Sequence, residues 1–247
     1  MGWFDAVNHA MSATATGGFS TRNASIAYFQ SPLIEYMVCL FMFIGGTNFT
    51  LIYFGFKGRF DKLYRNEEFK IYMSVVLFFT FIVCMGIFFL KDTSIEESFR
   101  FSLFQIIAVI TTTGFVNSDF TSWSSAITII FFLLMFAGAS AGSTAGGVKL
   151  VRHLIIVKNS ILEFKRLLHP SAIIPVRLSK KMIPPKIVFN VQAFILLYLS
   201  IFIIGSVIMA LFGFDFEVKL IGDNIISSMG SVAATLGNVG PGIGSVG

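Results

Sequence analysis

The twenty residues from Ile71 to Leu90 contain no charged side chain. An α-helix needs roughly 20 mostly apolar residues to cross the hydrocarbon core of a bilayer, and this run supplies them. Composition extends the argument to the whole chain, because 55% of the residues are hydrophobic and only 13% are charged. That balance is too apolar for a soluble domain. The sequence therefore predicts an integral membrane protein.

Other apolar segments have lengths that fit either a full membrane crossing or about half of one. We expect spanning helices at Leu33 to Phe56, which Gly45-Gly46-Thr47-Asn48 interrupts, and at Ile187 to Phe212. The stretch from about Ala126 to Phe136 is apolar as well. Three shorter segments carry acidic residues near their start, where a helix dipole favours negative charge. These predicted half-helices are Phe4 to Ala15 with Asp5, Ile95 to Thr111 with Glu96 and Glu97, and Phe214 to Ala234 with Asp215, Glu217 and Asp223.

Each predicted half-helix leads into a short Thr-x-Gly motif. A dehydrated cation needs several oxygens that point at one axis, and an extended backbone that glycine permits can supply them as carbonyls. Irregular backbone is tolerated at membrane depth only where protein or a watery cavity covers it, which favours one shared pore. A single motif has little specificity, but three copies in a repeating order predict an ion filter rather than glycine-rich membrane turns. The predicted filter residues are Thr16, Gly17 and Gly18, then Thr112, Thr113 and Gly114, and then Thr235, Leu236 and Gly237.

Ten consecutive small residues follow Ala137. Such a glycine-rich run cannot hold a stable helix through a bilayer, so we expect a flexible loop. Two interpretations stay open, an intramembrane gate below the filter and close helix packing through small residues. A phosphate-binding loop is excluded, because Val148 stands before Lys149 where the motif requires lysine followed by serine or threonine. The predicted gating loop comprises Gly138, Ala139, Ser140, Ala141, Gly142, Ser143, Thr144, Ala145, Gly146 and Gly147.

Basic residues gather in two connections of this predicted topology. Lys57 to Lys70 contains five Lys/Arg and Lys149 to Lys186 contains nine, together fourteen of the eighteen in the chain. The positive-inside rule places both connections in the cytoplasm and the filters outside. The outer face then holds nine acidic residues, which attract cations to the pore mouth. Two interpretations of the longer connection stay open. It is a docking surface for a cytoplasmic regulator or anionic lipid headgroups, or its charge is only the ordinary positive-inside bias.

Residues that would support an enzyme or a resident metal do not stand out. His9, His153 and His169 are far apart in this topology and lack ligand spacing, and no pair of nucleophile and base is evident. Glu35 is the one ionisable candidate near a span, and it lies at the predicted outer edge. We therefore expect no enzyme activity, no covalent cofactor and no nucleic-acid partner. A non-conducting membrane subunit or intramembrane enzyme remains the weaker alternative to a transporter.

Three segments resemble a known family. Ala15-Thr16-Gly17-Gly18-Phe19-Ser20-Thr21, Thr111-Thr112-Thr113-Gly114-Phe115 and Gly138 to Lys149 are similar to the TrkH family of bacterial potassium uptake proteins, within the Trk/Ktr/HKT superfamily. The resemblance implies an all-α integral membrane fold of potassium-channel-like M1-P-M2 units with re-entrant pore loops. It implies K+ as the transported ion, and a multi-pass position in the bacterial plasma (inner) membrane with the filters facing outside. It also implies a homodimer in lipid and a cytoplasmic nucleotide-binding regulatory ring of the TrkA type.

The resemblance assigns parts of the chain to family repeats. Gly18, Gly114 and Gly237 become the filter glycines of the second, third and fourth repeats. Because the family has four filter loops, we expect this chain to be part of a longer protein. The divisions are residues 1–69 for the pore loop and trailing helix of the second repeat, 70–186 for the third repeat with the gating loop and basic connection, and 187–247 for the fourth repeat as far as its filter.

Two transport hypotheses remain open from the sequence. One is a gated channel that passes K+ down its electrochemical gradient. The other is a sodium-coupled or Na+-permeable cation transporter. The first filter of the family would help to separate them, because a serine in place of glycine there relaxes potassium selectivity in relatives.

Overall fold

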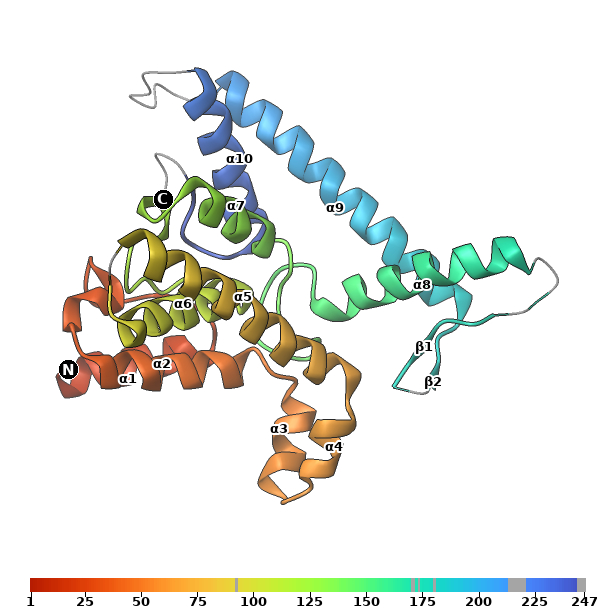
Figure 1. Ribbon diagram of the computed structural model, residues 1–247, viewed down its shortest axis with the longest axis horizontal. Coiled ribbons are helices and arrows are strands. Elements are labelled where there is room, and N and C mark those ends of the chain that lie inside the picture. Colours follow the sequence, from red (N-terminus) through yellow and green to blue (C-terminus); the bar gives the residue numbers. More distant parts are fainter. Residues whose placement is uncertain (92, 170–171, 173, 180, 213–220, 244–247) are drawn as a thin grey trace.

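Helices form most of the described part of the chain, which comprises residues 1–91, 93–169, 172, 174–179, 181–212 and 221–243 of a computed structural model. Figure 1 shows α1, α2, α5 and α6 gathered in one cluster, while α9 runs as a long diagonal between α8 and α10. The elements are α1 (Trp3–Thr14), the 3-10 turn η1 (Ser25–Phe29), α2 (Pro32–Gly45), α3 (Phe49–Phe56), α4 (Phe60–Arg65), α5 (Glu67–Lys91), α6 (Ile95–Ile110), the 3-10 turn η2 (Phe120–Ser122), α7 (Ser125–Leu134), α8 (Leu150–Leu168), β1 (Arg177–Leu178), β2 (Lys181–Met182), α9 (Pro185–Phe212) and α10 (Ile221–Gly237).

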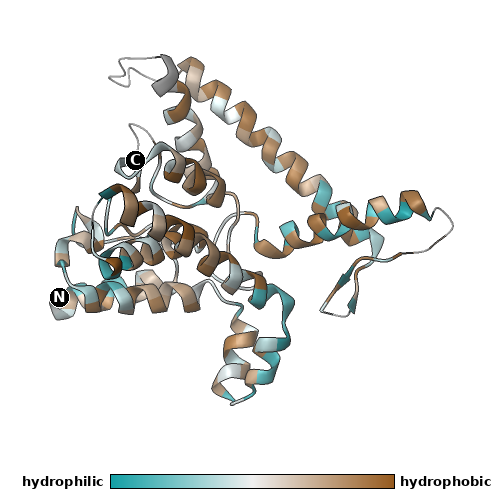
Figure 2. Cartoon of the chain, viewed as in Figure 1, coloured by the Kyte–Doolittle hydropathy of each residue, from teal (hydrophilic) through white to brown (hydrophobic). Residues whose placement is uncertain are grey.

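Two of these helices are long and apolar enough to cross a membrane by themselves. Helix α5 has 25 residues and α9 has 28. They cover the spans predicted at Ile71 to Leu90 and Ile187 to Phe212, and Figure 2 shows α9 as hydrophobic along most of its length. Both predictions are confirmed, and the chain has the apolar helices of a membrane protein.

A sharp bend between α2 and α3 falls at the interruption predicted at Gly45-Gly46-Thr47-Asn48 within the span from Leu33 to Phe56. The two helices differ in direction by 110°. A side chain at Gly46 would come within 2.7 Å of the Tyr72 hydroxyl, so glycine is what lets α2 end this close to α5. Asn48 then starts the new helix, because its side-chain oxygen accepts a hydrogen bond from the Thr50 N–H at 2.8 Å.

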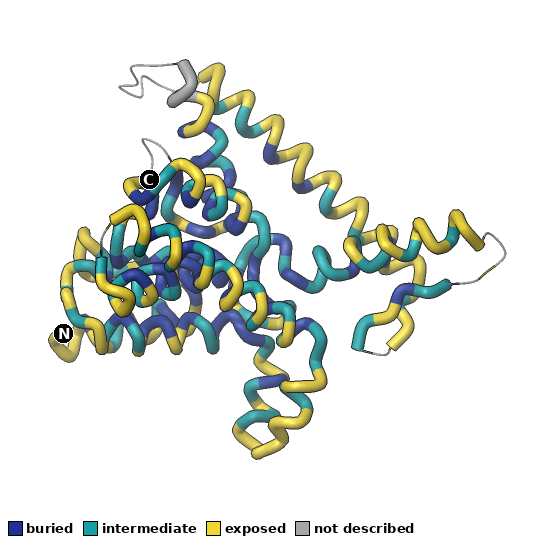
Figure 3. Tube along the Cα trace, viewed as in Figure 1, coloured by how far each residue is buried: buried dark blue, intermediate teal, exposed yellow. Residues whose placement is uncertain are grey.

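Helix α6 lies at the centre of the hydrophobic core. All residues from Phe104 to Ile110 are buried, and α6 packs against α2, α5 and α7. Figure 3 shows this buried centre, whereas α9 is exposed along most of its length. The buried residues of α9 include Val188, Tyr198 and Phe202. An apolar helix with so little buried surface suits a lipid environment.

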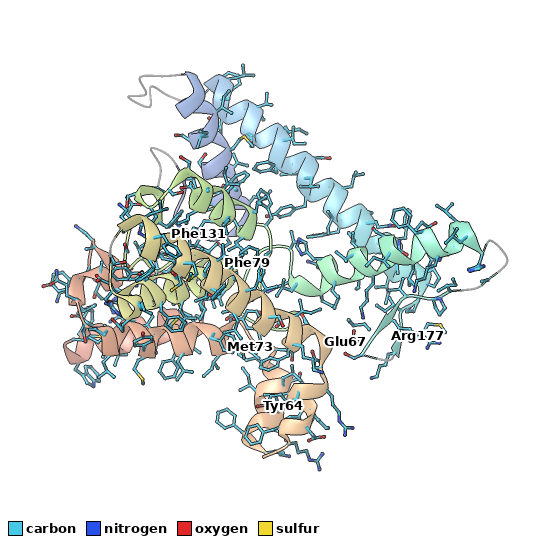
Figure 4. The ribbon with its side chains drawn as sticks, in the orientation of Figure 1. Tyr64, Glu67, Met73, Phe79, Phe131 and Arg177 are labelled. Carbon is cyan, nitrogen blue, oxygen red and sulfur yellow. The ribbon has the colours of Figure 1, made fainter. Side chains whose placement is uncertain are left out.

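A short hairpin of β1 and β2 is a small correction to the all-α prediction. The two strands pair antiparallel and have two residues each, too short for the alternating pattern that marks a strand in a sequence. Lys158 of α8 links the hairpin to α5, because its Nζ lies 2.5 Å from Glu67 Oε2 and donates to the Arg177 carbonyl oxygen at 3.0 Å. Figure 4 labels Glu67 and Arg177 on the two sides of this bridge.

The three predicted half-helices correspond to α1, α6 and α10. Helices α1 and α6 begin and end within one residue of the predicted bounds. Helix α10 runs from Ile221 to Gly237, three residues beyond the predicted end at Ala234, and the predicted start at residues 214–220 lies outside the described residues. Asp215 and Glu217 lie outside the described residues, and so does the side chain of Asp223.

Candidate ion pathway

The helices α1, α6 and α10 end with the same backbone hydrogen bonds. In each case one N–H after the helix donates to the carbonyl three residues back, and the next N–H donates to the carbonyl five residues before it. These pairings belong to helix ends that close through a left-handed residue. The donor and acceptor pairs are Thr16 to Ala13 at 3.2 Å and Gly17 to Ser12 at 2.8 Å, Thr112 to Val109 at 3.0 Å and Thr113 to Ala108 at 2.9 Å, and Asn238 to Thr235 at 3.1 Å and Val239 to Ala234 at 2.8 Å.

The backbone angles that follow each helix also match. The first left-handed residue has a φ of 51° at Thr16, 53° at Thr112 and 55° at Asn238. Two residues later a glycine again has positive φ. These glycines are Gly18 at 70°, Gly114 at 77° and Gly240 at 103°. The three equivalent loops are therefore residues 16–18, 112–114 and 238–240.

This equivalence corrects the position predicted for the third motif. Thr235, Leu236 and Gly237 lie in the last turn of α10, and the Thr235 hydroxyl donates to the Ser231 carbonyl within that helix at 2.8 Å. The loop comes three residues later, where Asn238 takes the left-handed position that threonine has in the other two loops. Asparagine tolerates this conformation well. Gly240 thus corresponds to Gly18 and Gly114, and the Asn-x-Gly pattern was the signal in the sequence.

The three loops lie side by side in a fixed order. A methyl group on Gly18 would overlap the carbonyl oxygen of Thr113, and one on Gly114 would overlap the carbonyl oxygen of Val239. Loop 16–18 therefore packs against loop 112–114, which packs against loop 238–240. Gly240 continues this contact, since a methyl group there would lie 3.5 Å from the Cα of Gly114. Only glycine allows two backbones to approach this closely.

The glycine-rich loop at residues 138–147 touches the ends of all three helices. The Thr144 hydroxyl donates to the carbonyl oxygen of Thr14, the last residue of α1, at 3.1 Å. The Gly146 N–H donates to Thr112 Oγ1 at 2.6 Å. A side chain at Gly146 would also come within 2.9 Å of the Gly237 carbonyl oxygen at the end of α10. One irregular segment thus spans the ends of the helices that carry the three loops.

Side chains from two other elements hold this glycine-rich loop. Glu68, in the first turn of α5, accepts a hydrogen bond from the Ala141 N–H at 2.5 Å. Asn48 donates to the carbonyl oxygen of the same residue at 2.6 Å. Lys149 donates from its Nζ to the Ala145 carbonyl oxygen. Glu68 lies in the basic connection predicted for the cytoplasm, and no local pattern ties it or Asn48 to a segment some 70 to 90 residues away.

A salt bridge holds the chain that leaves the first loop. Asp5 accepts hydrogen bonds from Thr21 Oγ1 at 2.7 Å and from Arg22 Nη2 at 3.0 Å. These two hydrogen bonds lower the pKa of Asp5, and the one from Thr21 has the larger effect. The carboxylate therefore stays ionised while it fastens residues 21 and 22. No cluster of His, Cys, Asp and Glu suitable for a metal ion occurs among the described residues.

Long apolar helices, a bent helix pair and glycine-rich breaks together define a multi-pass helical membrane protein. A family model for TrkH, described as a cation transport protein, matches residues 1–89 and 69–247. These matches cover the whole chain. The chain therefore belongs to the TrkH family of cation transport proteins, as its motifs predicted.

Similarity to individual proteins supports this family assignment. The chain is 34% identical over 246 residues to the Trk system potassium uptake protein TrkH of Salmonella typhimurium, covering 98% of this chain and 49% of that protein. It is 32% identical over 245 residues to TrkH of Halomonas elongata, covering 99% and 49%. The crystal structure of the potassium transporter TrkH from Vibrio parahaemolyticus matches with a TM-score of 0.88 at 31% identity, over 98% of this chain and 51% of that one. The chain thus spans about half the length of these relatives.

Proposed function

We propose that this chain contributes three loops to the pore of a potassium uptake protein. K+ would shed its water and pass between backbone carbonyls of residues 16–18, 112–114 and 238–240. The observation that carries the proposal is the shared backbone of these loops together with their direct packing. Carbonyls of adjacent loops are the ligands that replace water around a dehydrated K+ in a filter. Relatives of known sequence carry the names potassium uptake protein and potassium transporter.

The helices α1, α6 and α10 act in this proposal as re-entrant pore helices. Their C-terminal ends meet at the three loops, and each end carries partial negative charge that favours a cation. Helices α5, α6 and α7 would then form one complete M1-P-M2 unit. The α1 to α2 segment and the α9 to α10 segment would belong to two further units.

The glycine-rich loop is the gate in this proposal. Its hydrogen bonds to Thr14 and Thr112 place it against the ends of the pore helices. An ion leaving the loops on that side would meet this segment. The side chains of Glu68 and Asn48 would hold the gate closed through the backbone of Ala141.

Partners and membrane position follow from the same family membership. We propose a multi-pass protein of the bacterial inner membrane, with the loops facing outside and K+ as the transported ion. A second copy and a nucleotide-binding ring of the TrkA type are the proposed partners. Helix α8 offers a surface for a partner or for lipid, because it exposes Val157, Ile161, Phe164 and Leu168 beside basic residues.

Rubidium uptake tests the proposal. The complete protein that carries this chain is expressed in cells that lack their own potassium uptake, and Rb+ uptake is measured with and without excess Na+. Uptake that saturates with K+ or Rb+ and is independent of Na+ is the expected result. A requirement for Na+ would support the sodium-coupled alternative. Absence of uptake by protein shown to be in the membrane, with its regulatory partner supplied, would refute the transport proposal.

A further inference from the structure

Two side chains on one face of α1 hold the residues that follow the first loop. Asp5 binds Thr21 and Arg22, as described above. His9 lies one turn further along and is 1% exposed. Its Nδ1 is 2.6 Å from the Asp5 carbonyl oxygen and its Nε2 is 2.8 Å from the Ser20 hydroxyl. Because a carbonyl oxygen can only accept, Nδ1 donates to Asp5, and Nε2 shares a hydrogen bond with the Ser20 hydroxyl.

Gln105 makes the equivalent connection behind the second loop. It lies nine residues before Gly114, as His9 lies nine residues before Gly18. Its Nε2 donates to Asn117 Oδ1 at 3.0 Å and to the carbonyl oxygen of the next residue at 2.8 Å. The side chain is fully buried, so water does not compete for these bonds. In both cases a polar residue at the same position of the helix binds the segment that follows the loop.

A buried ion pair extends the second connection to α2. Asn117 Nδ2 donates to Glu35 Oε2 at 2.7 Å, and Glu35 Oε1 accepts from Arg100 Nη1 at 2.7 Å. The side chains of Glu35 and Arg100 are 5% and 11% exposed. Removing one partner of a buried charge pair is strongly destabilising, because the other charge is left desolvated. The pair therefore holds both side chains in place. The position of Asn117 is therefore set by two helices at once.

The two returning segments also brace each other. The Ala27 N–H donates to the Val116 carbonyl oxygen at 3.1 Å, and the Val116 N–H donates to Ser25 Oγ at 3.2 Å. The rings of His9 and Phe115 lie 5.7 Å apart between their centroids. A shift of the chain after Gly114 would thus reach the first loop as well.

We propose that Arg100, Glu35, Asn117 and Gln105 form a positioning network that sets the preference of the pathway for K+ over Na+. The inference rests on the proposed transport function. None of these side chains needs to touch the ion. Carbonyls discriminate between two cations only as far as the backbone keeps them at the spacing that suits one of them. The network holds the backbone three to four residues beyond Gly114 and so limits how far loop 112–114 contracts around the smaller ion.

Uptake of Rb+ and Na+ into liposomes by the purified complete protein tests this network. Glu35→Gln removes the buried negative charge that joins Arg100 to Asn117. Glu96→Gln is the matched control, because Glu96 also binds Arg100, at 3.0 Å, but its side chain is 56% exposed and reaches no loop residue. The double variant Glu35→Gln with Arg100→Gln removes both buried charges. It keeps the test valid if Arg100, left with only the exposed Glu96 as a charged partner, prevents the single variant from folding.

We expect the ratio of Rb+ to Na+ uptake to fall by about threefold or more in Glu35→Gln and in the double variant, the effect of losing one hydrogen bond of ordinary net strength. The ratio should stay at the wild-type value in Glu96→Gln. A wild-type ratio in a folded Glu35→Gln or double variant, while the wild-type protein carries Rb+, would overturn the network and leave the transport proposal standing. A wild-type protein that carries neither ion would overturn both.

Discussion

Replacing Gly114 with alanine tests whether loop 112–114 must touch the next loop. Gly114 has a φ of 77°, a conformation that costs an L-residue about 1–2 kcal/mol. Restricting the unfolded chain offsets about 0.4–1 kcal/mol of this cost. The methyl group would also overlap the Val239 carbonyl oxygen, which must move by roughly 1 Å to reach an ordinary contact. Overpacking of this kind adds about 1–3 kcal/mol, so we expect a total loss of stability of about 2–4 kcal/mol.

Gly58 provides the matched control for this substitution. It has a similar φ of 69°, but no described atom lies within 4 Å of an added methyl group. Gly58→Ala therefore carries the backbone cost alone, about 1 kcal/mol.

The two variants are compared by Rb+ uptake in cells that lack their own potassium uptake, with thermal unfolding of the purified proteins. We expect uptake to fall at least about tenfold in Gly114→Ala. This corresponds to about 1.4 kcal/mol of lost ion stabilisation in the displaced loop. Gly58→Ala should keep uptake near the wild-type level. Wild-type uptake by Gly114→Ala, or equal losses in the two variants, would refute the argument from loop contact.

Three further predictions concern the gate and the first loop. Deleting residues 139–145 should raise Rb+ flux at unchanged expression, whereas unchanged or lower flux in a folded variant would favour a packing role for this segment. Glu68→Ala removes the carboxylate that binds the loop backbone at 2.5 Å, and it should raise flux by about twofold to tenfold. Constant flux would show that the loop is held elsewhere. The pKa of Asp5 is lowered by its hydrogen bonds to Thr21 and Arg22, so its ionised form adds stability above its ordinary pKa of 3.8, and this is lost as pH falls through the lower folded-state pKa. The melting temperatures of wild type and Asp5→Asn should therefore converge as pH falls below the ordinary carboxyl pKa of 3.8, and a difference independent of pH would contradict this assignment.

Local patterns predicted the helices of this chain well. The apolar run at Ile71 to Leu90 and the acidic start of the helix at Ile95 depend only on nearby residues, and α5 and α6 lie where these signals place them. The same kind of pattern placed the first two loops at Gly18 and Gly114, where the structure has its left-handed glycines. The family was also accessible from the motifs, because their order along the chain is distinctive.

The third loop shows where such patterns fail. The Thr-x-Gly motif is present at Thr235, Leu236 and Gly237. However, α10 continues through these residues, and the backbone becomes left-handed only at Asn238. A Thr-x-Gly pattern does not predict where a helix ends, because the last turn of the helix depends on the contacts that the following residues make. Here the Val239 carbonyl packs against Gly114, from a distant part of the chain.

The sequence by itself determined that this chain enters a membrane, where its long apolar helices lie and which family it belongs to, because hydrophobic length, charge placement and motif order are properties of the chain alone. The tertiary structure decided which residues act together. Glu35 reaches Arg100 and Asn117, and Glu68 reaches Ala141, across 65 to 82 positions of sequence. A buried carboxylate finds its partner through the packing of separate helices, and no periodicity in one segment records which other segment lies beside it.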